Sequence, residues 1–381
     1  MKQLLLPLFL VLPFILPAQQ YDRLIDHAET LFQQKAYPAA LDTFKIALSD
    51  SFHAGRFDLY YGAKTAMYCN DQTLALRWLM LAGEKGLGTG DGEIAAVRTD
   101  STWQPLYSDP AWTRLLMKMD SAFGARQAAD KRRRAEWLTG LRADSLPPAA
   151  GHRFSPPRSG YALYFSRADT VAIPYLVYVP SSVPPGPPLT AIVYLHGGVA
   201  SHDDFDYQDP DLANEPVFAA ADSLHTLVIY PFAKKTFGWL DQKAAFEQVL
   251  KILQDAATRY SIAPHRIYMV GMSNGGSACF WFAAQDKTPF TGFLALSPLP
   301  KLNIGNIDFS RITRNRPLYS VNAKDDEVFS YSAVHDIYEK EAPVAKGWHF
   351  QALETGSHGF IYGPEGTALL LRYLREMTGQ K

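Results

Sequence analysis

The residues best suited to chemistry surround Ser273, where positions 270–276 read Val-Gly-Met-Ser-Asn-Gly-Gly. An apolar run precedes this segment and a stretch with helical spacing follows it, so we expect Ser273 on a tight turn from a strand into a helix. Gly271 and Gly275 have no side chains, which lets the two backbones pass closely at such a turn. The new helix directs free N–H groups toward negative charge that develops beside the serine. The pattern therefore predicts a nucleophilic serine.

A serine hydroxyl is a weak nucleophile until a histidine, oriented by a carboxylate, removes its proton. In the expected chain order the histidine comes last, and three candidates follow the region of the acid. His335 lies in a helical pattern and His349 alternates with aromatic residues in a strand pattern, so we expect both to be structural. His358 stands between Gly356-Ser357 and Gly359 in a loop after a strand. We predict that His358 is the base.

Two adjacent aspartates compete for the role of the orienting acid. They lie in Asn-Ala-Lys-Asp-Asp-Glu-Val, directly after the apolar run 318–321. Loops at the carboxyl ends of strands converge at one edge of a parallel sheet, where His358 is also expected. Asp325 comes first after the strand and stands three residues before Val328, so it is the preferred acid. Asp326 stays open as the alternative acid.

An oxyanion hole requires two backbone N–H groups directed at the developing negative charge. The sequence Leu-His-Gly-Gly-Val at 195–199 ends an early apolar run, where one donor is expected. Gly198 or Val199 is predicted to give this N–H group, and Asn274, directly after the nucleophile, the other. The glycine pair alone fits an ordinary turn equally well. The ordered serine, acid and histidine favour the oxyanion hole.

The elements that position these residues follow position 151, where short β-rich runs alternate with helical ones. This alternation is typical of a mostly parallel sheet covered by helices, so we predict an α/β domain over residues 151–381. Runs 161–165 and 174–180 indicate an opening antiparallel hairpin. The later expected strands lie at 189–198, 226–232, 266–273, 293–298, 317–323 and 349–353.

The first 18 residues carry the pattern of a secretory signal peptide. Lys2 precedes an apolar run from Leu4 to Leu16, and the small residue Ala18 follows it. The run is shorter than the roughly 20 apolar residues that a membrane-spanning helix needs, and no later stretch is suitable. We therefore expect a secreted or periplasmic protein without a transmembrane span.

Residues 19–125 have helical spacing and an internal repeat. The positions Ala28, Ala40, Phe44 and Ala47 recur 35 residues later as Ala63, Ala75, Leu79 and Ala82. This pattern resembles the tetratricopeptide repeat, whose period is about 34 residues, and the resemblance implies a surface for a protein partner. A plain helical hairpin bundle is the alternative. Residues 126–150 are predicted to be a linker, because Pro147 and Pro148 with small residues end this segment.

Composition excludes several other classes of protein. The 37 Lys and Arg residues nearly balance the 38 Asp and Glu residues, so the formal charge of −1 gives no attraction to nucleic acid. Neither Cys69 nor Cys279 has a neighbouring cysteine or histidine of the kind that a zinc site needs. We therefore predict no metal site.

The segments PYLVYVP, LHGG, VIYPF, APHRIYMVGMSNGG, NAKDDEV and TGSHGF succeed one another as in a known family. Over residues 151–381 the chain resembles α/β-hydrolase esterases related to polyhydroxybutyrate depolymerases and to feruloyl or acetyl xylan esterases. The resemblance implies ester hydrolysis through an acyl-enzyme, with the triad Ser273, Asp325 and His358 and an oxyanion turn after His196. It also implies a small-molecule or glycan-linked ester as substrate, and no metal or organic cofactor.

Two other functions remain open. A serine peptidase of the prolyl-oligopeptidase type has the same fold and triad, but the regularly spaced strands of its β-propeller are missing before position 151. A binding protein whose repeats recruit a partner and whose second domain is inactive is the other alternative. The ordered serine, acid and histidine argue against it.

Overall fold

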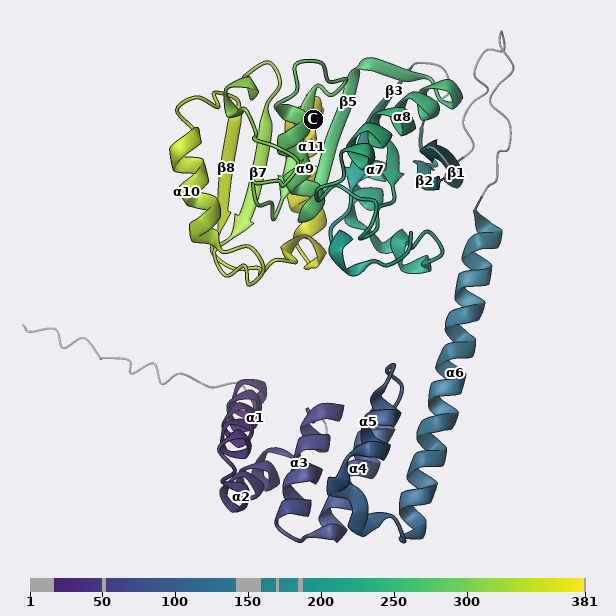
Figure 1. The fold of residues 1–381 in the computed structure, drawn as a ribbon, viewed down its shortest axis with the longest axis vertical. Coiled ribbons are helices and arrows are strands. Elements are labelled where there is room, and N and C mark those ends of the chain that lie inside the picture. The colour runs from purple at the N-terminus through teal and green to yellow at the C-terminus, as the bar shows by residue number, and fades with distance from the viewer. Residues whose placement is uncertain (1–16, 50–52, 142–158, 169–170, 184–187, 380–381) are drawn as a thin grey trace, which may run out of the picture. The chain divides into compact units, whose positions relative to one another are not determined.

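The computed structural model describes residues 17–49, 53–141, 159–168, 171–183 and 188–379 (Figure 1). The chain divides into two compact units, a helical unit, Met1–Arg132, and a sheet unit, Arg133–Lys381. Residues 1–16 of the predicted signal peptide lie outside the described residues, and residues 17 and 18 begin the first helix.

The helical unit consists of consecutive helices, as its sequence spacing predicts. They are α1 (Pro17–Gln33), α2 (Tyr37–Ala47), α3 (Arg56–Tyr68), α4 (Gln72–Glu84), α5 (Glu93–Thr99), the 3-10 helix η1 (Ser101–Leu106) and the first part of α6 (Pro110–Gly140). Side chains fix the helix starts: Asp58 accepts a hydrogen bond from the Gly55 N–H at 2.8 Å, and Asp71 accepts one from the Leu74 N–H at 3.1 Å. All eight repeat positions are buried. The all-α character is confirmed, whereas a tetratricopeptide function stays a prediction.

Helix α6 contains the first part of the expected linker, since it continues to Gly140. Within the sheet unit its end packs onto the domain: the Trp137 Nε1–H donates to the Tyr207 carbonyl at 2.9 Å, and the Trp137 ring meets the Tyr161 ring edge-on at 5.1 Å. Leu141 is buried in the same core. The rest of the expected linker, 142–150, lies outside the described residues.

The sheet unit has one eight-stranded sheet in the order β1-β2-β4-β3-β5-β6-β7-β8. The strands are β1 (Gly160–Ala168), β2 (Val171–Val179), β3 (Leu189–Leu195), β4 (Leu227–Pro231), β5 (Ile262–Met272), β6 (Gly292–Leu296), β7 (Leu318–Ala323) and β8 (Trp348–Leu353). β2 pairs antiparallel with β1 and β4, and all other neighbours pair parallel. With helices on both faces, this topology confirms the predicted α/β-hydrolase fold class.

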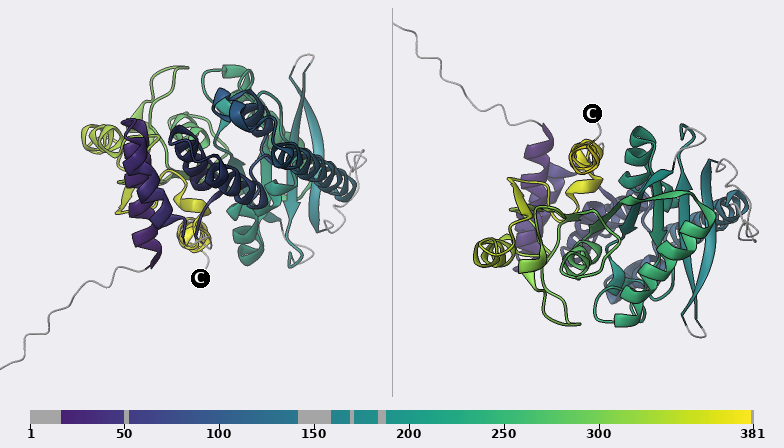
Figure 2. Two further views of the ribbon diagram at one scale, coloured as in Figure 1. Left: turned by 90° about the horizontal axis from the view of Figure 1, so that it is seen from below. Right: turned by 90° about the horizontal axis from the view of Figure 1, so that it is seen from above.

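Both faces of the sheet are covered, and its central strands are accordingly mostly apolar. Along β3, Ala191 and Val193 point into the core beneath α8 (Lys243–Arg259) and α9 (Asn274–Ala283), whereas Ile192 and Tyr194 point into the opposite core. That opposite core lies beneath α7 (Pro216–Leu224) and α11 (Gly366–Thr378), which Figure 2 shows on one side of the sheet. Helix α10 (Tyr331–Glu341) packs on the α8 side through Tyr338. This burial holds the carboxyl ends of the parallel strands at one edge.

Candidate active site

Ser273 occupies the sharp turn between β5 and α9, as expected. Its φ of 53° lies in the left-handed region, which is costly for a residue with a side chain. The turn is possible because its neighbours are glycines: a Cβ on Gly271 would lie 2.2 Å from the Gly275 backbone, and one on Gly275 would lie 1.9 Å from the Leu195 carbonyl oxygen. The strand, turn and helix thus hold the Ser273 side chain at the carboxyl edge of the sheet.

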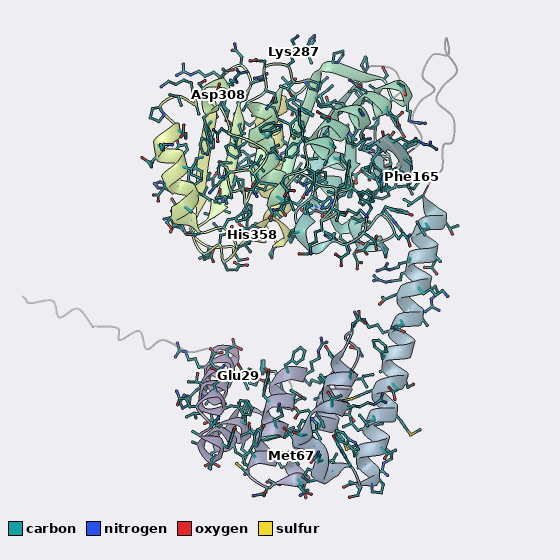
Figure 3. The ribbon with its side chains drawn as sticks, in the orientation of Figure 1. Glu29, Met67, Phe165, Lys287, Asp308 and His358 are labelled. Atoms are coloured by element: carbon teal, nitrogen blue, oxygen red, sulfur yellow. The ribbon has the colours of Figure 1, made fainter. Side chains whose placement is uncertain are left out.

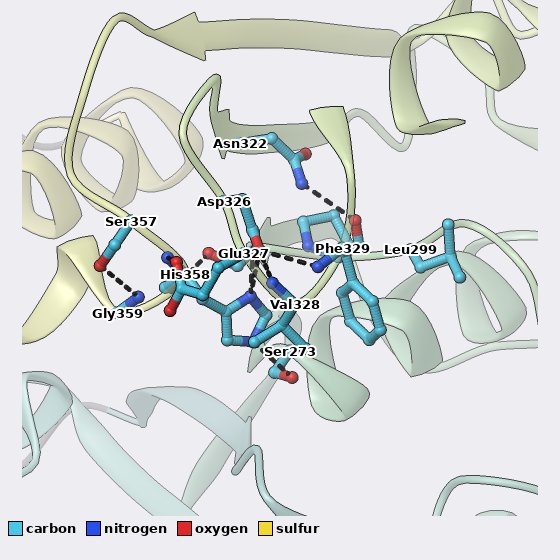
Figure 4. Close-up of polar contacts among 12 residues, drawn as sticks. Ser273, Leu299, Asn322, Asp326, Glu327, Val328, Phe329, Ser357, His358 and Gly359 are labelled. Atoms are coloured by element: carbon cyan, nitrogen blue, oxygen red, sulfur yellow. Dashed lines mark hydrogen bonds and ion pairs between the residues drawn. The ribbon is translucent and has the colours of Figure 1, made fainter. Parts of the chain in front are cut away.

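His358 reaches Ser273 from the loop that follows β8, 85 residues farther along the chain. Its Nε2 lies 2.8 Å from the Ser273 Oγ, within hydrogen-bond distance (Figure 4). Figure 3 labels His358 at the same edge of the sheet unit. Of the three candidate histidines, His358 contacts Ser273. His335 instead stacks on Tyr331 within α10, and His349 stacks on Tyr319 along the sheet.

Asp326 orients the histidine. Its Oδ1 and Oδ2 lie 3.0 Å and 2.9 Å from the His358 Nδ1. The Asp326 carboxylate is itself inaccessible to solvent and also accepts hydrogen bonds from the N–H groups of Val328 and Phe329, at 2.9 Å and 2.8 Å. An oriented carboxylate at Nδ1 leaves Nε2 of a neutral imidazole free to accept a proton.

The preference for Asp325 as the acid beside His358 is wrong. The Asp325 side chain is exposed and accepts hydrogen bonds from the N–H groups of Ser357 and Gly356, at 2.9 Å and 3.1 Å, which lower its pKa. β7 ends at Ala323, and the turn that follows directs residue 325 outward and residue 326 inward. The direction of each side chain in this turn, and not its distance from the end of β7, therefore determines which aspartate contacts His358.

Sequence reasoning missed the contact between Glu327 and the backbone of His358. Its Oε2 accepts a hydrogen bond from the His358 N–H at 3.2 Å. Together, Asp325 and Glu327 hold the backbone of residues 356–358, while Asp326 holds the imidazole. The run of three acidic residues at 325–327 was the sequence feature that could have indicated this contact.

The predicted oxyanion residues lie beside Ser273. A Cβ on Gly197 would lie 2.9 Å from the Ser273 Cβ, which brings the turn after β3 against the serine. Gly198 has a φ of 68°, a conformation that favours glycine. The Val199 N–H donates to the Asn274 Oδ1 at 3.2 Å. One predicted donor therefore already binds an amide oxygen, and the Asn274 backbone N–H lies at the start of α9.

His196 supports this turn, a role that sequence reasoning did not assign to it. Its Nδ1–H donates to the Gly197 carbonyl oxygen at 2.7 Å, and its Nε2 accepts from the Ala233 N–H at 3.0 Å. The Trp239 Nε1–H donates to the His196 carbonyl oxygen at 3.0 Å. Burial lowers the pKa of His196 to about 4, so the ring stays neutral and keeps one donor and one acceptor.

A cavity of about 630 Å³ opens in front of Ser273 and His358, within the size range of small-molecule sites. A larger hollow of about 1220 Å³ lies in the helical unit, but its wall contains no histidine and no cysteine, so we place the candidate site in the sheet unit. Across the described residues, no group of three metal-binding side chains comes together. None of the helices in the described part of the chain is long and apolar enough to cross a membrane.

No protein-family model matches the chain. No curated protein matches it either. Among solved structures, the chain is similar to FphF, a fluorophosphonate-binding serine hydrolase of Staphylococcus aureus. The two share 14% sequence identity, the match covers 58% of this chain and 99% of FphF, and the TM-score is 0.46. A ferulic acid esterase has 17% identity, coverage of 58% and 98%, and a TM-score of 0.46. The acylaminoacyl peptidase of Pyrococcus horikoshii has 14% identity, coverage of 58% and 42%, and a TM-score of 0.45.

Proposed function

We propose that this protein is a serine hydrolase that cleaves carboxylic esters through an acyl-enzyme on Ser273. One observation carries the proposal: His358 bridges Ser273 and Asp326, with Nε2 at 2.8 Å from the serine oxygen and Nδ1 at 2.9 Å from the carboxylate. A serine, a histidine and a buried carboxylate in this chain of contacts form the arrangement that activates a hydroxyl.

In the first step, the Ser273 Oγ attacks the ester carbonyl carbon while the His358 Nε2 takes its proton. Asp326 stabilises the resulting imidazolium, and the imidazolium then protonates the leaving alcohol. In the second step, water loses a proton to the His358 Nε2 and attacks the acyl carbon. The imidazolium then returns the proton to the Ser273 Oγ as the bond from this oxygen to the acyl carbon breaks, which releases the acid and restores Ser273. All reacting groups come from the chain, the substrate and water.

The oxyanion formed in each step needs N–H donors, which the turn at 197–199 and Asn274 supply in this proposal. In the structure, the Asn274 side-chain oxygen accepts the hydrogen bond of the Val199 N–H. Binding of the substrate oxygen to that N–H therefore requires the Asn274 amide to turn away. The Asn274 backbone N–H is favoured as the second donor because the start of a helix stabilises negative charge.

The proposal is tested with nitrophenyl esters of short acids, peptide anilides and a fluorophosphonate probe. We expect ester turnover and labelling in the wild type, and loss of both in Ser273→Ala. Ser223→Ala, which removes an exposed hydroxyl on α7, is the matched control and should retain both. Turnover of anilides in place of esters would instead support a serine peptidase. Absence of fluorophosphonate labelling would support an inactive binding protein.

We also propose that the chain is exported, to the periplasm or the medium. The support is the pattern of residues 1–18, in which a lysine, an apolar run and a small residue follow one another.

A further inference from the structure

The cavity in front of Ser273 has an acidic wall. Four carboxylate residues line it: Asp206, Asp209, Asp211 and Glu215. Two of these have positively charged or titratable neighbours, since Asp211 pairs with Arg133 at 3.0 Å and Asp206 contacts the His202 ring. Among the described residues that line the cavity, none is a lysine or an arginine. The wall therefore favours positive over negative ligands.

Glu215 is the most unusual of these groups. It directly precedes α7, and its side-chain carboxylate accepts hydrogen bonds from the hydroxyls of Tyr194, Tyr230 and Tyr362, at 3.2, 3.4 and 3.4 Å. Burial raises the pKa of Glu215, although these hydroxyls counteract the effect. Buried carboxylates are normally paired with a cation, because removing a charge from water is costly. Glu215 is half-buried, and among the described residues its carboxylate receives hydrogen bonds but forms no ion pair.

Aromatic side chains line the same cavity as Glu215. Phe329 is half-buried and Tyr362 is exposed, whereas Tyr230 and Phe232 are almost completely buried. The negative faces of such rings attract organic cations, above all when a carboxylate lies nearby. The rings also replace the water that a cation loses on entering the cavity. A carboxylate among aromatic rings fits an ammonium group better than a neutral polar group.

The acidic wall belongs to the reaction site. Glu215 and Tyr362 line the same cavity as Ser273 and His358, and Tyr362 follows His358 by four residues. We propose that the substrate is an ester that carries an organic cation, an ammonium group, and that Glu215 binds this group during hydrolysis. This inference rests on the proposed esterase function and specifies its substrate class.

Matched substrate pairs test the inference in the full-length protein. One pair is acetylcholine and its uncharged isostere, in which carbon replaces the quaternary nitrogen. The other is the nitrophenyl ester of an acid that ends in a trimethylammonium group, compared with the acid that ends in a tert-butyl group. We expect kcat/KM to be about tenfold higher for the cationic member of at least one pair, as a single charge contact of about 1.4 kcal/mol gives.

In Glu215→Gln, which keeps the side-chain shape and removes the charge, this preference should fall to near unity. Asp204→Asn removes a charge from an exposed position outside the cavity wall and should keep the preference. Tyr362→Phe keeps the ring and the Glu215 charge and should keep it as well. Equal kcat/KM within both pairs in the wild type, or a preference that Glu215→Gln leaves intact, would overturn the inference while the esterase function stands.

Binding to Ser273→Ala, measured by calorimetry, separates this inference from the reaction itself. The cationic member of a pair should bind about tenfold more tightly than the neutral one, and Glu215→Gln in the same background should abolish the difference. If the wild type hydrolyses no ester and takes no fluorophosphonate, the proposed function fails. In that case the binding measurement still tests the cation site, and equal affinity for the cationic and the neutral member would reject it.

Discussion

At the scale of single residues, the consecutive acidic residues 325–327 all contact His358 or the loop that carries it, but at different places. Asp326 contacts the His358 ring, whereas Asp325 and Glu327 contact the backbone of the loop that carries it. A carboxylate beside the imidazole determines its tautomer and stabilises its positive charge, but a carboxylate on the loop backbone contributes only to its position. The two adjacent aspartates should therefore differ greatly in their effect on catalysis.

We expect Asp326→Asn to lower kcat by about 10⁴-fold, because an amide at this place no longer stabilises the imidazolium and favours the wrong tautomer. Asp325→Asn should lower kcat by about tenfold or less, because Asp325 contacts only the loop backbone and the amide oxygen still accepts from one of the two N–H groups. Steady-state kinetics on a nitrophenyl ester gives both values. A larger loss in Asp325→Asn than in Asp326→Asn would show that our assignment of the acid is wrong.

At the scale of elements, the position of Ser273 depends on the close contact of a strand, a turn and a helix, where glycines leave no side chains between the backbones. Gly271 and Gly275 allow β5 and α9 to pass, and Gly275 also lies against β3 through the Leu195 carbonyl oxygen. The strained backbone of Ser273 persists because this packing holds it. A side chain at Gly275 must move either the helix or the neighbouring strand.

Gly275→Ala should lower the free energy of unfolding by about 3 kcal/mol, as overpacking does in a closely packed core, and should remove activity. Gly124→Ala is the contrasting change, since a Cβ at this helical position in α6 meets nothing within 4 Å. It should raise stability by about 0.5–1 kcal/mol, because glycine weakens helix interiors. Urea unfolding of the two variants and the wild type measures both changes, and comparable small effects would contradict the packing argument.

At the scale of the whole molecule, the chain combines a helical unit and a sheet unit that each have their own core. The acidic cavity and the reacting side chains all belong to the sheet unit. Export, which we propose for this chain, rests on the pattern of residues 1–18, which precede the described helices. It would determine in which compartment the proposed hydrolase meets its substrate.

Export predicts that the mature protein from its native host begins after Ala18. Leu10→Arg places a charge in the apolar run and should keep the chain in the cytoplasm with residues 1–18 attached. Sequencing of the N-terminus and fractionation of the cells test this. A wild-type chain that stays in the cytoplasm with its first residues intact would contradict the proposal.

The sequence by itself determined the elements, because each depends on local patterns. The apolar run, glycines and serine at 266–276 predict a strand, a tight turn and a helix, and the repeated alanines at 28–82 predict packed helices. It also selected His358 over His335 and His349, since only His358 follows a strand in a glycine-rich loop. These inferences required spacing, residue type and chain order.

Only the tertiary structure decided which adjacent aspartate faces His358, since one residue of a turn separates an exposed side chain from a buried one. It alone also brought Glu215 together with Tyr194, Tyr230 and Tyr362, which lie far apart along the chain. Contacts of this kind arise from the packing of β3, β4, α7 and the loop after β8 into one edge of the sheet. Their physical cause is the orientation of side chains in three dimensions, which no local pattern encodes.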